Sequence, residues 1–124
     1  RQRLLSEYVS LFESWDIASL VKLVKRDAEF SMPPFPLWVR GPDEIARFMH
    51  GPGAKCEGSR LLVTEANGCP AVGLYNRDGD GWAPWAIVVL EMSDGAISGL
   101  HHFLYPELFA EFGLPPRLDG EHVG

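Results

Sequence analysis

The sequence lacks both a long apolar run and a cluster of basic residues. Its 124 residues carry a formal net charge of -6, and residues 61–124 hold two basic against nine acidic side chains. A membrane-spanning helix needs roughly 18 apolar residues in succession, and a protein that grips phosphate backbones needs clustered Lys and Arg to displace counterions. We therefore expect a cytoplasmic protein that contacts neither a membrane nor nucleic acid directly.

Cysteine is equally scarce. Cys56 and Cys69 are the only two, and their spacing matches neither a zinc ribbon nor a redox motif. We expect two free, partly buried thiols, as is usual in a reducing compartment. Residues 78–81, Asp-Gly-Asp-Gly, are typical of a turn, because no calcium-ligand frame with a closing glutamate follows them. The sequence therefore predicts no metal site and no cofactor.

What the chain does have is enough apolar sequence for one core. Hydrophobic residues make up 46% of it, and a chain of this length buries about two-thirds of its unfolded surface on folding. We expect a single domain over residues 1–118 and a flexible tail over residues 119–124. Residue 1 falls within or just before an expected helix, as in a domain cut from a longer chain.

Apolar periodicity and turn residues predict an α+β domain. Asp16 is a suitable N-cap between two leading helices, and Pro42 is a suitable first residue for a third helix. Strand-like runs separated by glycine-containing breaks follow, and they predict a meander of four antiparallel strands. The expected helices cover residues 4–15, 17–24, 42–49 and 106–113, and the expected strands cover residues 28–32, 60–67, 71–77, 82–92 and 96–105.

The stretch FSMPPFPLW, from Phe30 to Trp38, interrupts this pattern with three prolines in four positions. Proline cannot donate to a strand ladder, so these residues belong at an edge or rim. We expect the first strand to end at Met32 and the prolines to form a rigid lip on one side of a cup. Trp38 would then offer a flat surface to a ligand, a partner or another subunit.

The order of these elements resembles the cone-shaped fold shared by nuclear transport factor 2, ketosteroid isomerase and the SnoaL-like polyketide cyclases. The resemblance covers nearly the whole chain and rests on YVSLFESWDIASLVKLVKRDAEFSMPP, the later RGPDEIARFM and the four strands after them. It implies helices packed in a curved, mainly antiparallel sheet. Proteins of this fold often dimerise, so the resemblance also implies a homodimer.

A narrower resemblance points to transcription. The segments FSMPPFPLWVRG, EANGCPAVGLY and FLYPELFAEFGLPPRL resemble the C-terminal domain of one group of bacterial extracytoplasmic-function (ECF) sigma factors. This resemblance implies a regulatory or small-molecule-sensing domain that modulates transcription initiation. Its implied partners are the upstream sigma-factor regions and RNA polymerase.

The isomerase's catalytic residues can be compared with this sequence one at a time. Tyr8 matches the tyrosine on the first helix of the isomerase. The proton-shuttling acid falls on Met32, directly before Pro33, and the second acid falls in the apolar run 86–88 around Ile87. Methionine cannot accept a proton, so the general base is missing. We therefore expect a non-catalytic domain.

The alternative is a small enzyme of the polyketide cyclase or isomerase type that acts on an apolar ligand. It requires Glu65 or Glu91 to point inward, or His102 to act with Tyr8. Charged residues are seldom buried, so solvent-facing carboxylates are the simpler interpretation. His101 and His102 are adjacent strand residues on opposite faces, which argues against a shared metal. The resemblance places His102 inside the cone, either as a ligand contact or as a hydrogen-bonded histidine of the wall.

The remaining feature is an apolar cup. Tyr8 and His102 are its only two polar side chains, and a mostly apolar cavity with few polar groups is typical of small-molecule sites. We expect a small apolar molecule to bind there, although ordinary core packing would use the same residue types. The candidate ligand-binding residues are Tyr8, Phe12, Met32, Trp38, Phe48, Trp85, Ile87, Leu100, His102 and Leu104.

Overall fold

The structure, a computed structural model, describes residues 2–119 as a six-stranded sheet with helices before, within and after it. The helices are α1 (Gln2–Glu13), α2 (Ile17–Leu20) and α3 (Gly41–His50), and the short 3₁₀ helices are η1 (Val21–Leu23), η2 (Pro52–Cys56) and η3 (Pro106–Phe112). The strands are β1 (Val24–Met32), β2 (Phe35–Arg40), β3 (Arg60–Ala66), β4 (Cys69–Asp78), β5 (Gly81–Ser93) and β6 (Ala96–Phe103).

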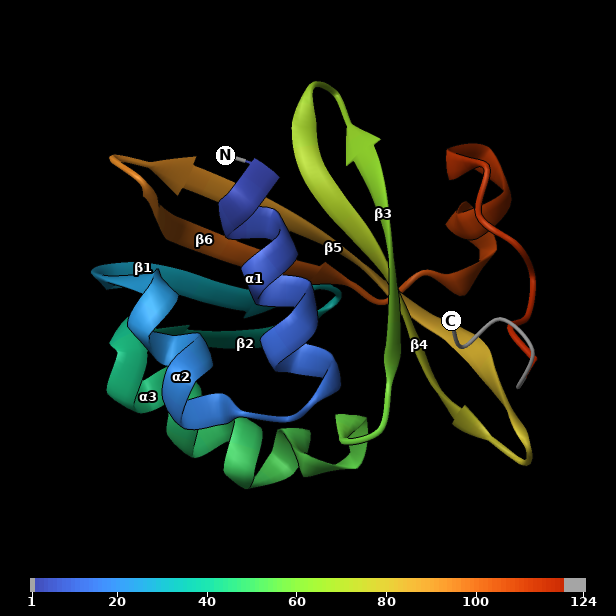
Figure 1. Ribbon diagram of the computed structural model, residues 1–124, viewed down its shortest axis with the longest axis horizontal. Coiled ribbons are helices and arrows are strands. Elements are labelled where there is room, and N and C mark those ends of the chain that lie inside the picture. Colours follow the sequence, from blue (N-terminus) through green and yellow to red (C-terminus); the bar gives the residue numbers. More distant parts are fainter. Residues whose placement is uncertain (1, 120–124) are drawn as a thin grey trace.

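The strands form one curved sheet in the order β2-β1-β6-β5-β4-β3. Only β1 and β6 run parallel, and every other neighbouring pair in this order is antiparallel. The helices α1, α2 and α3 gather on one side of the sheet, and η3 lies on the other (Figure 1). The expected α+β fold, with helices packed in a curved and mainly antiparallel sheet, is confirmed.

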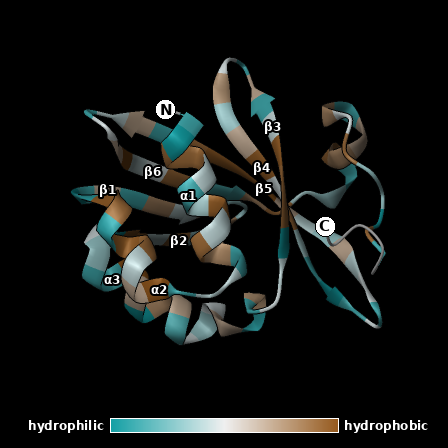
Figure 2. Cartoon of the chain, in the orientation of Figure 1, coloured by the Kyte–Doolittle hydropathy of each residue, from teal (hydrophilic) through white to brown (hydrophobic). Residues whose placement is uncertain are grey.

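The main core lies between the sheet and the three helices. Leu4, Tyr8 and Phe12 follow one another at intervals of four residues on α1, so one face of this helix is buried against the strands. Asp16 caps α2, as predicted, because its Oδ1 accepts a hydrogen bond from the Ser19 backbone nitrogen at 3.2 Å. In Figure 2 hydrophobic residues line β5 and α2, whereas the tip of the β4–β5 hairpin is hydrophilic.

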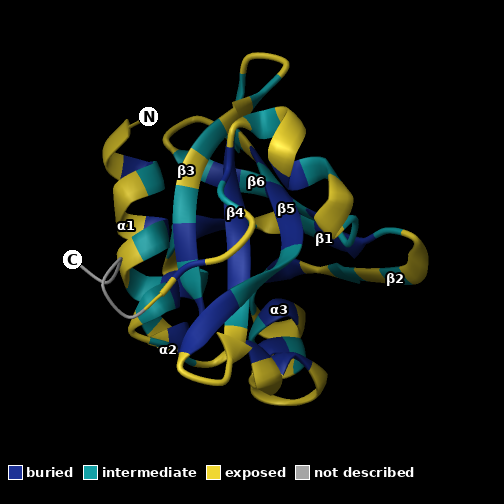
Figure 3. Ribbon diagram, turned by 90° about the vertical axis from the view of Figure 1, so that its right-hand side faces the viewer, coloured by how far each residue is buried: buried dark blue, intermediate teal, exposed yellow. Residues whose placement is uncertain are grey.

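A second core lies on the opposite face of the sheet. Phe109, Leu114 and Leu118 from the C-terminal segment pack against Tyr75 and Ile87 of β4 and β5. The Tyr75 hydroxyl also donates to the backbone oxygen of Pro115 at 2.7 Å, which fixes the returning chain. Because both faces are covered, β4 is buried from Ala71 to Tyr75 and β5 from Ala86 to Val88, whereas β2 is exposed at its tip (Figure 3).

The proline-rich segment that was expected to form a rigid lip contains a turn and the start of a strand, β2. Residues 33 and 34 form a turn, and the chain then pairs back on β1 as β2, with Phe30 opposite Val39 and Ser31 opposite Trp38. The expectation of five strands was therefore wrong by one. The reason is that β2 is an edge strand, where Pro36 is tolerated because its missing N–H need not serve a second neighbour.

The helix boundaries also differ from those expected. The first helix ends at Glu13 because Trp15 adopts a left-handed conformation, with φ of 58°. The second is a short α-helix continued by a 3₁₀ turn, and Val24 already pairs with Ile97 in the sheet. The closing helix is a 3₁₀ helix that ends at Gly113, with φ of 72°.

Within residues 2–119 no helix is both long and apolar enough to cross a membrane. The single domain over residues 1–118 stays a prediction. Of the expected tail over residues 119–124, only Asp119 belongs to the part of the chain that the structure describes.

Candidate functional site

An apolar pocket of about 460 Å³ opens between the helices and the concave face of the sheet. Its floor is made by residues that the fold buries, and its rim is formed by the exposed side chains Phe35, Pro52 and Lys55. The residues that line it are Phe12, Trp15, Phe30, Met32, Phe35, Leu37, Phe48, Met49, Pro52, Gly53, Lys55, Cys56, Leu74, Trp85, His102 and Leu104.

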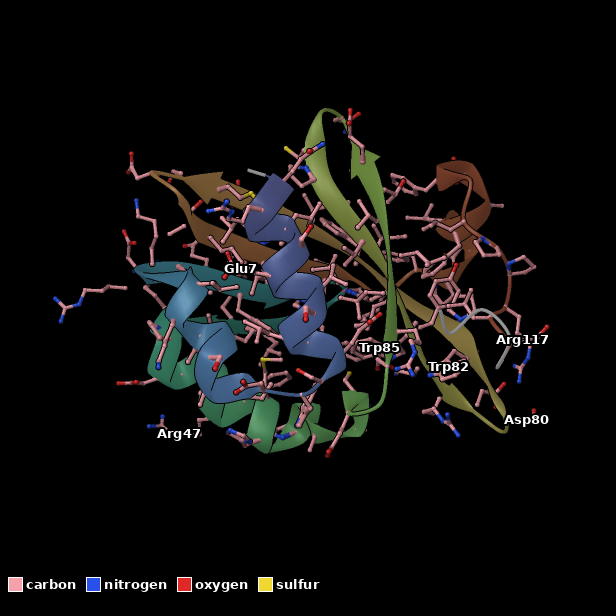
Figure 4. The ribbon with its side chains drawn as sticks, viewed as in Figure 1. Glu7, Arg47, Asp80, Trp82, Trp85 and Arg117 are labelled. Carbon is pink, nitrogen blue, oxygen red and sulfur yellow. The ribbon has the colours of Figure 1, made fainter. Side chains whose placement is uncertain are left out.

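One wall of the pocket depends on an irregularity in β5. Leu74 pairs with Ala86 but Tyr75 pairs with Pro84, so Trp85 is an extra residue without a partner on β4. Such a bulge re-aims side chains, and here both Trp85 and Ala86 pack on the inner core. Figure 4 shows Trp85 toward the C-terminal end of α1, whereas Trp82 lies farther out along the β4–β5 hairpin.

His102 contributes an imidazole to the pocket lining. Its Nδ1 lies 3.3 Å from the backbone oxygen of Ser31, and its ring packs on Phe30 with the ring centroids 4.4 Å apart. Burial lowers the pKa of His102 to about 4, an effect that outweighs the opposing hydrogen bond to Ser31. The ring is therefore neutral near pH 7. Because a carbonyl can only accept, the Nδ1 contact with Ser31 requires a proton on Nδ1.

None of the described residues that line the pocket carries a carboxylate. Glu65 and Glu91 are exposed, and neither belongs to the lining. Lys55 is the only charged side chain among the described residues that line the pocket, and its ammonium nitrogen lies 5.8 Å from the ring centroid of Trp85. Cys56 is buried, which raises the pKa of its thiol to about 11 and keeps it protonated. The site can hold an apolar molecule, but it offers no strong proton acceptor.

Six of the ten expected ligand-binding residues line this pocket. Two others, Tyr8 and Leu100, belong to the packed inner core and do not line it. Burial in that core raises the pKa of Tyr8 well above its ordinary value. The expected residues that do line it are Phe12, Met32, Phe48, Trp85, His102 and Leu104.

Two expected residues lie on the other face of the sheet. Trp38 is 63% exposed and contacts His101 edge-on, with the ring centroids 6.3 Å apart. Alternation along β2 sends Phe35 and Leu37 to the pocket and Trp38 away from it, so Phe35 occupies the rim position expected of Trp38. Ile87 belongs to the second core, because the bulge at Trp85 shifts the alternation of β5.

Several lining residues were missed by sequence reasoning. Phe30 could have been found, since it lies two residues before Met32 on one strand and so faces the same side. The segment Pro52–Cys56 gives no comparable signal. It reaches the pocket because η2 turns back toward α3, where a side chain on Gly53 would crowd Phe48.

A polar network lies on the outer face, opposite the pocket. His101 joins the Ser31 hydroxyl, 2.7 Å from Nδ1, to the Glu91 carboxylate, 2.8 Å from Nε2. His101 and His102 thus point to opposite faces, as predicted. Gly99 leaves room for this network, because a side chain there would collide with Glu91 and His101. Among residues 2–119 no three His, Cys, Asp or Glu side chains are grouped as metal ligands.

Comparison with known proteins connects the chain to a sigma factor. No family model matches it. It is 38% identical over 119 residues to the ECF RNA polymerase sigma factor SigG of Mycobacterium tuberculosis. The match covers 94% of this chain and 32% of SigG, so the chain spans about a third of the length of this curated relative.

Solved structures share the fold at low sequence identity. A candidate ketosteroid isomerase from Kribbella flavida has a TM-score of 0.66 and 21% identity, over 83% of this chain and 76% of that one. A nuclear transport factor 2-like protein of unknown function from Cytophaga hutchinsonii has a TM-score of 0.63 and 12% identity, over 88% and 93%. The chain therefore has the nuclear transport factor 2-like, ketosteroid isomerase-like fold and is similar in sequence to part of an ECF RNA polymerase sigma factor.

Proposed function

We propose that this chain is a non-catalytic, small-molecule-binding domain that modulates transcription initiation by an ECF sigma factor in the bacterial cytoplasm. The observation that carries the proposal is a pocket whose lining, within residues 2–119, has no carboxylate, in a chain that is similar to SigG over 94% of its length. Its partners would be the other regions of the sigma factor and RNA polymerase. A bound molecule would change how the domain contacts them.

The pocket supports the binding part of this proposal. Its volume of about 460 Å³ lies within the range of about 300–1,000 Å³ that is usual for small-molecule sites. Its lining is apolar except for Lys55 and His102, with the Cys56 thiol protonated. Such a site gains affinity from apolar contact and orients a ligand through one or two polar groups.

The binding test uses the chain immobilised on a resin and exposed to a cytosolic metabolite extract. Mass spectrometry of the washed resin should find compounds that the wild type retains and that Met32→Trp, which fills the pocket from β1, does not. The control variant Lys22→Met lies outside the pocket and should retain the same compounds. Equal retention by wild type and Met32→Trp, or no retention at all, would contradict the binding proposal.

The sigma-factor part needs a separate test. The remaining two-thirds of a SigG-type sigma factor, purified without this domain, should bind the chain in solution, as followed by calorimetry. Addition of the retained compounds should change the affinity. Absence of any contact between the two parts, together with unchanged transcription on removal of the domain, would reject this role.

An enzyme is the second candidate function, because a protein described as a ketosteroid isomerase shares the fold and His102 lines the pocket. Among the lining residues that the structure describes, the candidate proton acceptor is the neutral His102, whose pKa of about 4 makes it a weak base at pH 7. If a retained compound is converted by the wild type but not by His102→Gln, the enzyme interpretation replaces the non-catalytic one.

A further inference from the structure

The rim of the pocket is positively charged, because Lys55 lies there. Lys55 is exposed, and among residues 2–119 no carboxylate is paired with it. Its ammonium group lies over the face of Trp85, at 5.8 Å from the ring centroid. A cation at this distance is attracted by the aromatic ring. The contact therefore holds a positive charge beside the opening.

On the floor of the pocket, none of the residues that the structure describes is charged at pH 7. It consists of buried apolar side chains together with His102, which is hydrogen-bonded to Ser31, and the protonated thiol of Cys56. An ionised group pushed to this depth would lose its hydration without gaining a partner, which is costly. A charged ligand must therefore keep its charge at the rim, beside Lys55, and place its apolar part below.

We propose that the pocket takes an amphipathic carboxylate, with its apolar body on the floor and its carboxylate beside Lys55. This inference rests on the proposed function, because it names the class of the small molecule bound there. An alkylammonium ion of the same length would meet like charge at the rim. An uncharged alcohol of the same length would fill the floor and gain nothing from Lys55.

The test is a set of affinities measured by calorimetry at pH 7, below the concentrations at which the probes form micelles. The probes are octanoic, decanoic and dodecanoic acid, the matched primary alcohols and the matched alkylammonium ions. Each buried methylene should tighten binding about fourfold in every series. At equal length the acid should bind about two- to fivefold more tightly than the alcohol, and the ammonium ion more weakly than both.

Two variants assign the preference to Lys55. Lys55→Met should remove the preference for acids and leave the alcohols unchanged. Lys22→Met removes an exposed lysine outside this pocket and should keep the preference. High salt should reduce the preference in the wild type, because the carboxylate–ammonium pair is exposed.

The outcomes separate this inference from the proposed function. If acids and alcohols bind equally well and Lys55→Met changes nothing, the carboxylate assignment is wrong while small-molecule binding stands. If no series binds but compounds are still retained from the extract, the ligand class is again wrong. If no series binds and nothing is retained, the proposed binding function itself fails. Binding of a hydrophobic sigma-factor peptide in place of every probe would also overturn the inference.

Discussion

At the scale of single residues, His102 carries the most information about the pocket. It lies on β6 with its side chain buried, and its Nδ1 lies 3.3 Å from the backbone oxygen of Ser31. Burial favours the neutral ring and lowers its pKa to about 4. In the unfolded chain the same ring titrates near its ordinary value of 6.5. The two states therefore bind different numbers of protons between these values.

This difference predicts how stability depends on pH. Between pH 6.5 and pH 4 the unfolded chain holds the extra proton, so the free energy of unfolding rises with pH in this window. Acidification from pH 6.5 to pH 4 should cost about 3 kcal/mol through His102 alone. Urea unfolding of the wild type and of His102→Gln at several pH values measures this loss in the free energy of unfolding. An equal pH dependence in both proteins would show that His102 is not the cause.

The residues around His102 show what sequence reasoning could reach at this scale. Alternation along β6 correctly assigns His101 and His102 to opposite faces, because the side chains of a strand alternate whatever its partners are. The same rule fails for Trp85 and Ile87. The bulge that moves them arises from how β5 pairs with β4. Pro84 directly before Trp85 is its one sequence signal, because a proline within a central strand is found at a bulge.

At the scale of elements, the C-terminal segment is a structural cover for the outer face. Phe109 on η3 packs edge-on against Tyr75, with the ring centroids 5.0 Å apart, and Leu114 packs beside Gly73. A side chain on Gly73 would collide with Leu114 and crowd Phe109. This segment therefore keeps the second core dry without contributing to the pocket.

This placement predicts that Phe109→Ala destabilises the fold but spares the pocket. Phe109 is 2% exposed, and truncation of a buried Phe to Ala costs about 3–5 kcal/mol. Chemical denaturation measures the loss. The half-buried Phe112 on the same element serves as control, and Phe112→Ala should cost less. A loss of ligand affinity in Phe109→Ala, under conditions where the variant is folded, would mean that the two faces are not independent.

At the scale of the whole molecule, the two faces of the sheet differ in what they expose. The concave face carries the pocket, and the C-terminal segment covers part of the outer face. Trp38 lies elsewhere on the outer face, beside the network of Ser31, His101 and Glu91. The homodimer expected from the resemblance stays a prediction, and a large exposed aromatic residue is the kind of side chain that dominates interfaces.

We therefore predict that Trp38→Ser weakens self-association at least about tenfold, as expected for the loss of an interface hot spot. Phe35 is similarly exposed, at 60% against 63% for Trp38, but lines the pocket on the opposite face. Phe35→Ser should leave the association unchanged. Sedimentation equilibrium of the wild type, Trp38→Ser and Phe35→Ser measures the dissociation constant of self-association. A monomeric wild type, or equal weakening by both substitutions, would place the interface elsewhere or exclude it.

The sequence by itself determined the types of α1, α2 and β6, because these follow from short-range patterns. Four-residue spacing of apolar side chains gave α1, alternation gave β6, and Asp16 marked the start of α2. The tertiary structure alone decided that β2 joins the sheet, that Trp85 bulges toward the pocket and that Pro52–Cys56 closes its rim. These features depend on contacts between segments far apart in the chain. Local periodicity does not specify which distant segments pack together.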